Sequence, residues 1–279
     1  MKKNHQTLLW QFYHKKTVDV GNPDSFGKGP QRTHFIIGTM HSKDNRVFRH
    51  IEKNYEKIKL CDVFATEFPL DDAAEIDVQQ YMLLPEGDTL TSILTPNLHK
   101  KTTTLFKKKM GLDLAQFERF SPFFLTNILS ENALNADNFL SLDEKMWQFA
   151  KNEGKILRGL ETLDEQLDVL KKMSVTDHIK GLKDIVTKHD KFRKKLQKMV
   201  KLYEKQDIVA LYQLSKKSTQ ANRKLMLYDR NALMIDRILT LTNDNTLCAA
   251  VGAGHLYGKK GILNLLKMKG FVVTPVLEK

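Results

Sequence analysis

The sequence predicts an α/β protein with a central mixed sheet flanked by helices and a largely helical middle segment. Short apolar runs typical of buried strands occur near both ends of the chain, at His34–Ile37 and Leu247–Val251. Apolar residues at helical spacing follow each run, and most of the chain between residues 73 and 238 has a helical pattern. We therefore expect α/β segments at the two ends and helices between them.

Three strands and a helix are expected in the first quarter of the chain. The apolar segments Leu8–Tyr13 and His34–Ile37 flank a polar stretch with glycine and proline (21–32), as in a long hairpin. Apolar side chains at helical spacing predict a helix over Val47–Leu60, and the alternating segment Asp62–Phe68 predicts the third strand. A strand, a helix and a strand in this order predict a βαβ unit with parallel pairing.

The middle of the chain contains two helical stretches that are separated by a short strand. Residues 73–150 and 164–238 have mostly helical patterns, and Lys155–Arg158 predicts the strand between them. Prolines interrupt the first helical stretch, at Pro85, Pro96 and Pro122. The C-terminal part then returns to a strand, a helix and a strand, over Leu247–Val251, Gly261–Lys269 and Phe271–Val276.

One helix of the second stretch is strongly basic. Lys188–Lys205 contains eight basic and two acidic residues. Its apolar residues lie on one stripe, formed by Phe192, Leu196, Met199, Val200 and Tyr203. We expect an amphipathic helix whose lysines face water; the alternative is an arm that contacts a partner or a membrane surface.

The composition excludes several classes of protein. The chain has 279 residues and a net charge of +12, but only nine of its 45 basic residues are arginine, and no nucleic-acid-binding motif occurs. We therefore expect no specific nucleic-acid partner. No apolar run is long enough for a transmembrane segment, and no signal peptide is visible. The expected location is the cytoplasm, or outside it if a leader has been removed.

Two similar segments, Gly38–His41 and Gly252–His255, each follow an apolar run. Each histidine is thus expected just beyond the carboxyl end of a strand, where open α/β sheets place their ligands. Two imidazoles delivered in this way suggest a metal site formed by His41 and His255. The alternative is that each histidine caps a helix or bonds a backbone carbonyl.

A metal site of this kind also needs an oxygen ligand. Glu67 ends an otherwise apolar strand, where a carboxylate is costly to bury unless it is paired or binds a metal. Two histidines and one carboxylate form an open catalytic geometry for Zn²⁺, Mn²⁺, Co²⁺ or Fe²⁺. Glu161 also follows a strand and is expected to be a second ligand or a general base, or else the N-terminal acid of a helix.

Arg230 is a further candidate for the site. It lies within a predicted helix and would hold a substrate carboxylate or stabilise a developing oxyanion. The alternative is a bridge to Asp229 or to another acid at the edge of the core. The sequence contains neither a GxSxG nor an HExxH motif, so it gives no support to a Ser-His-Asp hydrolase.

The order of these motifs resembles the TraB/GumN family, which includes the TIKI metalloproteases and the pheromone-shutdown proteins. The resemblance extends from about residue 8 to residue 276 and is specific only when the motifs are taken together. The residues that carry it are Leu9-Trp10, Gly38–His41, Glu67, Leu84–Leu90, Gly159–Thr162 with Gln166, Arg230-Asn231, and Gly252–Leu256 with Gly258 and Gly261.

The resemblance implies a fold similar to the erythromycin-esterase/ChaN-like superfamily and one domain over residues 1–279, with a helical insertion at about 165–240. It also implies an active site built from both GxxH histidines and the glutamate. We expect His41, Glu67 and His255 to hold a divalent metal (Mn, Co or Zn). Within that site we expect catalytic roles for Glu161 and Arg230, and substrate contacts for Asn231 and Gln166.

The function predicted from these residues is metal-dependent hydrolysis of a peptide or a small acyl substrate. The first alternative is a non-catalytic protein that binds or sequesters peptides in the same pocket. The second is a scaffold built on the basic helix, with GxxH turns that are only structural. Metal content separates this scaffold from the other two, and peptide cleavage separates the enzyme from the binding protein.

Overall fold

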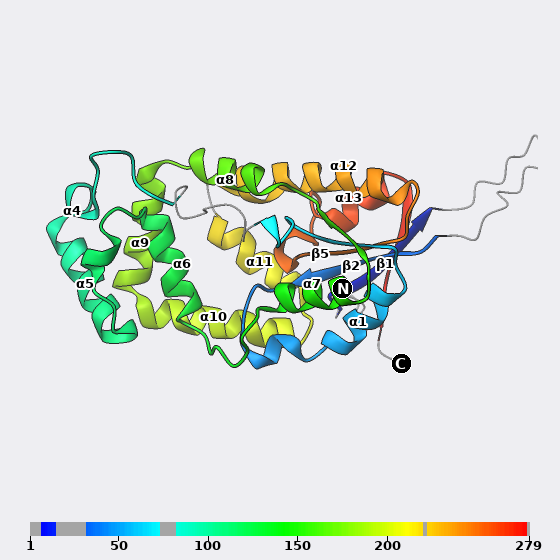
Figure 1. The fold of residues 1–279 in the computed structure, drawn as a ribbon, viewed down its shortest axis with the longest axis horizontal. Coiled ribbons are helices and arrows are strands. Elements are labelled where there is room, and N and C mark those ends of the chain that lie inside the picture. The colour runs from blue at the N-terminus through cyan, green and yellow to red at the C-terminus, as the bar shows by residue number, and fades with distance from the viewer. Residues whose placement is uncertain (1–6, 15–31, 73–81, 220–221, 278–279) are drawn as a thin grey trace, which may run out of the picture.

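A six-stranded mixed sheet forms the centre of the computed structural model, which describes residues 7–14, 32–72, 82–219 and 222–277 (Figure 1). The order of the strands across the sheet is β4-β3-β5-β2-β1-β6. The α/β class predicted from the sequence is confirmed. The strands are β1 (Leu9–His14), β2 (His34–Thr39), β3 (Val63–Thr66), β4 (Ile156–Gly159), β5 (Leu247–Gly252) and β6 (Phe271–Pro275).

The expected hairpin is present, because β1 pairs antiparallel with β2 over Leu9–Phe12 and His34–Ile37. Most of the polar stretch between these two strands lies outside the described residues. Strands β2 and β3 are parallel, as the βαβ pattern predicts, but they do not pair with each other. The C-terminal strand β5 lies between them and pairs parallel with both. Direct pairing was therefore the wrong expectation, and the composition of β5 explains why: its run of small apolar residues is almost fully buried, which suits a central parallel strand.

Helices cover both faces of the sheet. Helices α1 (Ile51–Lys59) and α7 (Leu142–Asn152) pack against each other on one side, and α12 (Arg230–Thr242) and α13 (Ile262–Met268) lie on the other side (Figure 1). This arrangement follows from right-handed crossovers: those that lead from β2 to β3 and on to β4 run in one direction, and those that lead back to β5 and β6 run in the other.

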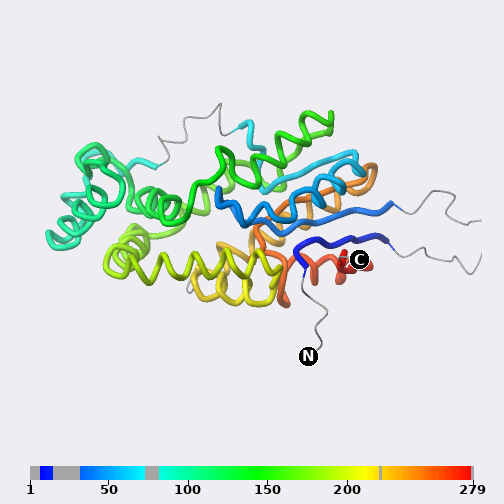
Figure 2. The backbone as a smooth tube through the Cα atoms, turned by 90° about the horizontal axis from the view of Figure 1, so that it is seen from below, coloured from blue at the N-terminus to red at the C-terminus, as the bar shows by residue number. Residues whose placement is uncertain are grey.

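A second group of helices forms a region beyond one edge of the sheet, at the left in Figure 1 and again separate from the strands in Figure 2. We call it the helical region. It consists of α4 (Leu90–Ile93), α5 (Pro96–Met110), α6 (Pro122–Glu131) and α9 (Val175–Thr187). It has its own apolar core, which includes Leu90, Phe106, Leu125 and Leu182. This core draws on residues 84–129 as well as on the expected insertion.

Two of the prolines that interrupt the helical pattern mark helix starts. Pro96 and Pro122 occupy the first turns of α5 and α6, where a missing N–H costs nothing. The preceding residues, Thr95 and Ser121, cap these helices with their side-chain oxygens. The two prolines therefore divide the first helical stretch into separate short helices.

The remaining helices bring the chain back from the helical region to the sheet. They are α8 (Leu163–Lys171), α10 (His189–Glu204), α11 (Ile208–Thr219) and the π-helix η4 (Lys224–Asp229). Helix α10 is the predicted basic amphipathic helix, and it buries Val200 and Tyr203. No helix in the part of the chain that the structure describes is long and apolar enough to cross a membrane.

Candidate active site

The predicted site residues follow strands that end at one edge of the sheet. The parallel strands β2, β3, β4 and β5 place their carboxyl ends side by side, because Thr39 pairs with Gly252 and Thr66 with Gly159. Glu67, Glu161 and His255 come shortly after three of these strands. The edge therefore collects polar groups from segments far apart in the sequence, as open α/β sheets do at their ligand sites.

Glu67 is held by groups from two other segments. The backbone N–H of Gly252 donates to its Oε1 over 2.7 Å, and Nη2 of Arg230 donates to its Oε2 over 2.6 Å. Burial alone would raise the pKa of Glu67, but nearby His255 and Arg230 and the Gly252 hydrogen bond lower this pKa to about 2. Glu67 is therefore a carboxylate at neutral pH.

The glycine that opens the second GxxH segment is required by this contact. A Cβ at residue 252 would lie 3.0 Å from Oε1 of Glu67, which is the atom that the Gly252 N–H binds. A side chain at this position would have to displace the carboxylate. The first glycine of the motif is thus part of the site and does more than end a strand.

Glu161 is more deeply buried, with a side chain that is 1% exposed. Its carboxylate accepts from Nε of Arg230 at 2.9 Å and from Nη2 at 2.5 Å. Nε2 of Gln166 also donates to Oε2, over 3.2 Å. Since Thr162 caps the following helix with its side chain, Glu161 is not itself the capping acid.

Arg230 joins the two carboxylates. Its guanidinium bonds both Glu67 and Glu161, while neighbouring Asp229 binds Lys224 instead. These partners outweigh the effect of burial and raise the pKa of Arg230 further above its ordinary value. The residue begins α12 directly after the π-helix η4, a type of distortion that often occurs at functional sites.

Asn231 fixes the protonation of His255. Its Nδ2 donates to the carbonyl oxygens of Lys260, at 2.7 Å, and His255, at 3.2 Å, so its Oδ1 is left to accept. Nδ1 of His255 lies 2.6 Å from this Oδ1 and must donate to it. The proton is thereby assigned to Nδ1, which leaves a lone pair on Nε2.

The lone pair of His255 faces the carboxylate of Glu67. Nε2 lies 3.8 Å from Oε1 of Glu67, too far for a hydrogen bond. Burial and Arg230 outweigh the attraction of Glu67 and lower the pKa of His255 to about 4, so the imidazole is neutral at neutral pH. Two electron-pair donors therefore face each other across a gap.

His41 is placed apart from this cluster. Its Nδ1 lies 3.6 Å from Oδ2 of Asp143, and its side chain is 65% exposed. The hydrogen bond with Asp143 raises the pKa of His41. In the described ranges, no group of three His, Cys, Asp or Glu side chains is arranged to hold a metal ion. A common ligand for His41 and His255 stays a prediction.

The cluster opens into a pocket of about 280 Å³. Glu67, Arg230 and His255 line one end of it. The sequence analysis missed most of the other lining residues, because apolar residues on amphipathic helices have the same pattern whether they face a core or a cavity. They are Thr39, Met40, Met199, Tyr203, Leu211, Ser215, Ser218, Thr219, Met226, Leu227, Gly252, Ala253 and Gly254.

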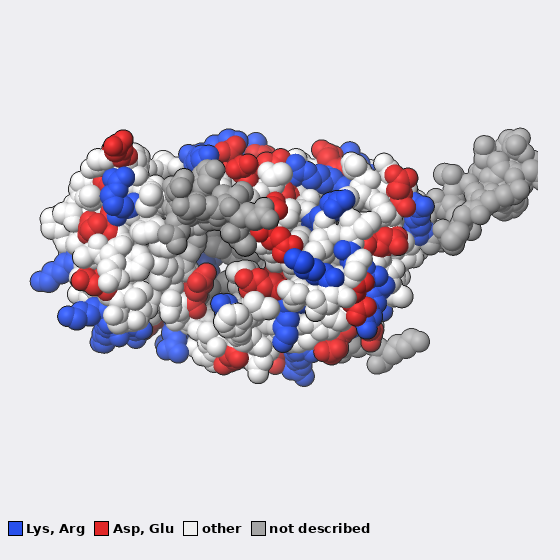
Figure 3. Space-filling model, viewed as in Figure 1, with Lys and Arg blue, Asp and Glu red and all other residues white. Residues whose placement is uncertain are grey.

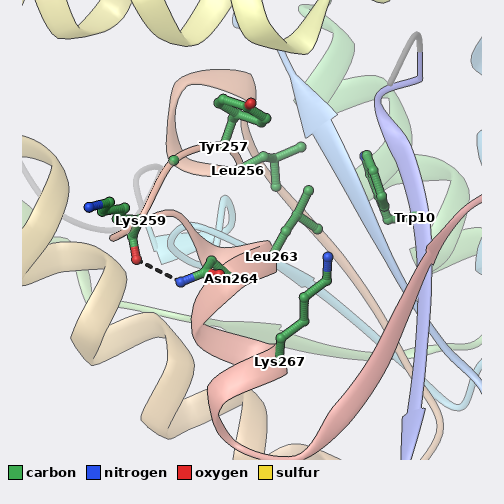
Figure 4. A pocket seen from close by; sticks show the side chains of 8 residues that line it. Trp10, Leu256, Tyr257, Lys259, Leu263, Asn264 and Lys267 are labelled. Carbon is green, nitrogen blue, oxygen red and sulfur yellow. Dashed lines mark hydrogen bonds between the residues drawn. The ribbon is translucent and has the colours of Figure 1, made fainter. Parts of the chain in front are cut away.

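A second pocket of about 370 Å³ lies beside α13. Trp10, Leu256 and Leu263 form its apolar wall, and Lys259, Asn264 and Lys267 are also among the residues that line it (Figure 4). Its described lining contains no carboxylate and no histidine. This pocket is larger, but it has no acid–base groups, so the pocket at Glu67 and His255 is the candidate active site.

Comparison with known families agrees with this arrangement of residues. A model of the TraB/PrgY/gumN family matches residues 27–275, which is most of the chain. The chain belongs to the TraB/PrgY/gumN family. The resemblance inferred from the motifs is thereby confirmed, and the matched range includes every candidate site residue.

One curated relative of this TraB/PrgY/gumN protein is the metalloprotease TIKI2 of Xenopus tropicalis. The two are 22% identical over 298 residues, which cover 86% of this chain and 57% of the relative. The chain thus spans little more than half the length of the curated relative that it matches. No solved structure matches the chain.

Proposed function

We propose that this TraB/PrgY/gumN protein is a metal-dependent hydrolase that cleaves peptide or related acyl bonds. The observation that carries the proposal is the gap of 3.8 Å between the lone pair of His255 Nε2 and the carboxylate of Glu67. The metalloprotease name of the Xenopus relative supports the same chemistry. The active site would be the pocket that these two residues line.

The donor groups fit a divalent metal as two of its ligands. An imidazole nitrogen and a carboxylate oxygen suit Zn²⁺, Mn²⁺ and Co²⁺ alike. Two carboxylates share the single guanidinium of Arg230, so one net negative charge remains when both are ionised. His255 and Glu67 would hold the ion, and His41 is the third protein ligand that we propose. When bound, such a metal lowers the pKa of its water and polarises a carbonyl.

The other residues would keep these donors in place. Asn231 orients the imidazole through Nδ1, the type of outer contact that fixes metal-binding histidines. Arg230 holds Glu67, and Glu161 with Gln166 holds Arg230. Because both oxygens of Glu161 accept from Arg230, we propose that Glu161 acts as an orienting residue and not as a free base. Asn231 and Gln166 would then support the site from behind.

Metal binding and peptide cleavage test the proposal. Purified protein would be stripped with a chelator and titrated with Mn²⁺, Co²⁺ and Zn²⁺ by calorimetry, and then assayed on a peptide library with and without metal. We expect binding of at least one of these metals, and cleavage only in its presence. Replacing His255 with alanine should weaken binding at least 100-fold, because a ligand is lost and the buried Asn231 loses its partner.

His99→Ala is the matched control. His99 also faces a glutamate, with Nε2 of its ring 2.8 Å from Oε1 of Glu118, but this pair lies in the helical region. Its removal should leave metal affinity unchanged. Absence of binding in the wild type, or equal losses in both variants, would overturn the metal proposal. Metal binding without cleavage would favour the peptide-sequestering alternative.

His41→Ala decides the third ligand separately. If His41 binds the metal, this variant should lose affinity as His255→Ala does. If affinity is unchanged, His41 belongs with Asp143, as the structure places it.

A further inference from the structure

The candidate active site continues into a wall that the catalytic residues do not explain. Three elements form it: α10 contributes Met199, α11 contributes Leu211 and Ser215, and the end of η4 contributes Met226 and Leu227. We call these residues, together with Met40, Ser218 and Thr219, the pocket wall. The wall faces the same cavity as Glu67 and His255, so whatever fills it lies next to the reacting bond.

The pocket wall offers no partner to a charged group. Among the described residues that line the cavity, the ionised side chains are Glu67 and Arg230, and these bind each other. An ammonium or carboxylate group that entered the wall would lose its water and gain no counter-charge. The wall therefore discriminates against charged side chains.

The hydroxyl groups of the wall are already satisfied by the helix that bears them. Ser218 Oγ donates to the carbonyl oxygen of Leu214, and Thr219 Oγ1 donates to that of Ser215. Such bonds to the preceding turn leave the hydroxyls without need of a ligand. The wall consequently presents carbon and sulfur surface to its occupant.

Three methionines make this surface adaptable. Met40, Met199 and Met226 are each partly buried and line the cavity from three different segments. Methionine side chains are unbranched and polarisable, and they fit themselves to apolar groups of different shape. The cavity of about 280 Å³ is near the lower limit for small-molecule pockets, so it has room for only a small part of a peptide.

We propose that the pocket wall is a subsite for one apolar side chain of the substrate, adjacent to the bond that is cleaved. The proposal rests on the proposed function and names its substrate class: peptides with leucine, methionine, phenylalanine or a similar residue at that position. The subsite excludes charged residues strongly and distinguishes little among apolar residues of similar size.

Equilibrium binding of blocked peptides tests the subsite without requiring turnover. The full chain, stripped of metal by a chelator, would be titrated with a positional series in which one residue is leucine, methionine, phenylalanine, glutamine, lysine or aspartate. At one position we expect the apolar peptides to bind at least tenfold more tightly than the lysine and aspartate peptides. Among the apolar peptides the differences should stay below tenfold.

Met226→Asp places a charge in the wall, and Met268→Asp is its matched control. Met268 is 73% exposed and lies on α13, outside the pocket. Met226→Asp should weaken binding of the leucine peptide at least tenfold and improve binding of the lysine peptide, whereas Met268→Asp should change neither. Met226→Gln and Met199→Gln are neutral variants that carry the test if the aspartate prevents folding; each should weaken leucine binding.

The outcomes separate this proposal from the proposed function. Equal binding of leucine and lysine peptides at every position, or wall variants that bind as the wild type does, would overturn the subsite. Metal-dependent cleavage that ignores the side chain would do the same, while leaving the hydrolase intact. Selective binding of apolar peptides with no cleavage under any metal would support the subsite and end the hydrolase proposal.

Discussion

The two hydrophobic cores of the molecule differ in what they bury. The core around the sheet encloses polar and ionisable groups, among them His34, Glu161, Asn231 and His255. In the described part of the helical region, the buried polar residue is Thr102, whose hydroxyl bonds the helix that bears it. The sheet body thus pays for polar burial with specific partners, whereas the helical region is held by apolar packing.

This difference teaches where a substitution should affect chemistry and where it should affect only stability. Each buried polar group of the sheet body depends on particular partners, so its removal leaves another group unsatisfied. A leucine of the helical core has many interchangeable contacts. The following experiments test that division, from the largest expected effect to the smallest.

Arg230→Met should be the most damaging change. It leaves Glu67 and Glu161 in the site without their shared counter-charge, and removal of one member of a buried ion pair costs about 3–5 kcal/mol. The free energy of unfolding, measured in urea, should fall by this amount. Adding Glu161→Gln should restore part of the loss.

Arg237→Met is the matched control for this effect. Arg237 also binds a glutamate, Glu165, but both side chains are about one-third exposed. Such pairs contribute about 0–1 kcal/mol. Equal losses for the two arginine variants would show that the buried network has no special role in stability.

Leu125→Ala should destabilise the helical region without changing the site. Leu125 is fully buried in α6, and deletion of such a side chain costs about 2–5 kcal/mol. At temperatures well below the melting transition, calorimetry should give the metal and peptide affinities of the wild type. A loss of affinity in the folded variant would contradict the division between the regions.

Acidification should weaken the sheet body through His34. Burial, together with nearby His14 and Arg32, lowers the pKa of this residue to about 4, and its Nδ1 accepts from the backbone N–H of Leu247. The unfolded chain takes up this proton near pH 6.5 and the folded chain only near pH 4. Stability should therefore fall as the pH drops through this window, by up to about 3 kcal/mol.

His34→Gln separates this contribution from the rest of the titration. Glutamine keeps an acceptor for Leu247 but does not titrate. Urea unfolding between pH 7 and pH 4 should show a shallower loss of stability than in the wild type. An unchanged slope would mean that other groups cause the acid sensitivity.

The exposed lysines of α10 should have the smallest effect. Lys and Arg side chains gather along the lower edge of the helical region on the face seen in Figure 3. Replacing the exposed residues Lys191, Lys194 and Lys198 with glutamate should change the free energy of unfolding by no more than about 0.5 kcal/mol per site. Metal affinity should not change, since Met199 and Tyr203 on the other face of the helix line the pocket. Loss of metal binding would place the basic face in the active site.

Local patterns in the sequence were sufficient to predict all six strands and the edge of the sheet where the site lies. A short apolar run that ends in glycine specifies a buried strand, and the polar residue after it specifies what that strand delivers. Glu67, Glu161 and His255 were found in this way. The union of Arg230 with both glutamates was only one of several alternatives.

Features that depend on distant segments could not be predicted in the same way. No local pattern reports that β5 lies between β2 and β3, because the pairing partners are about as far apart as the chain allows. The direction of the His41 side chain depends on Asp143, roughly a hundred residues away in sequence. The π-helix at η4 breaks the 3.6-residue period, which hides Met226 from a periodicity analysis.

The central position of β5 also has a consequence for the birth of the protein. A ribosome that has just released β3 must still add residues 67–246 before β5 can begin, which takes roughly 10–40 seconds at ordinary rates of synthesis. Throughout that time the nascent chain has neither Gly252 nor His255, and the facing edges of β2 and β3 lack their partner. Unpaired strand edges invite association with other chains. The emerging polypeptide is consequently inert towards any substrate but in need of protection, and both conditions end when β5 is inserted.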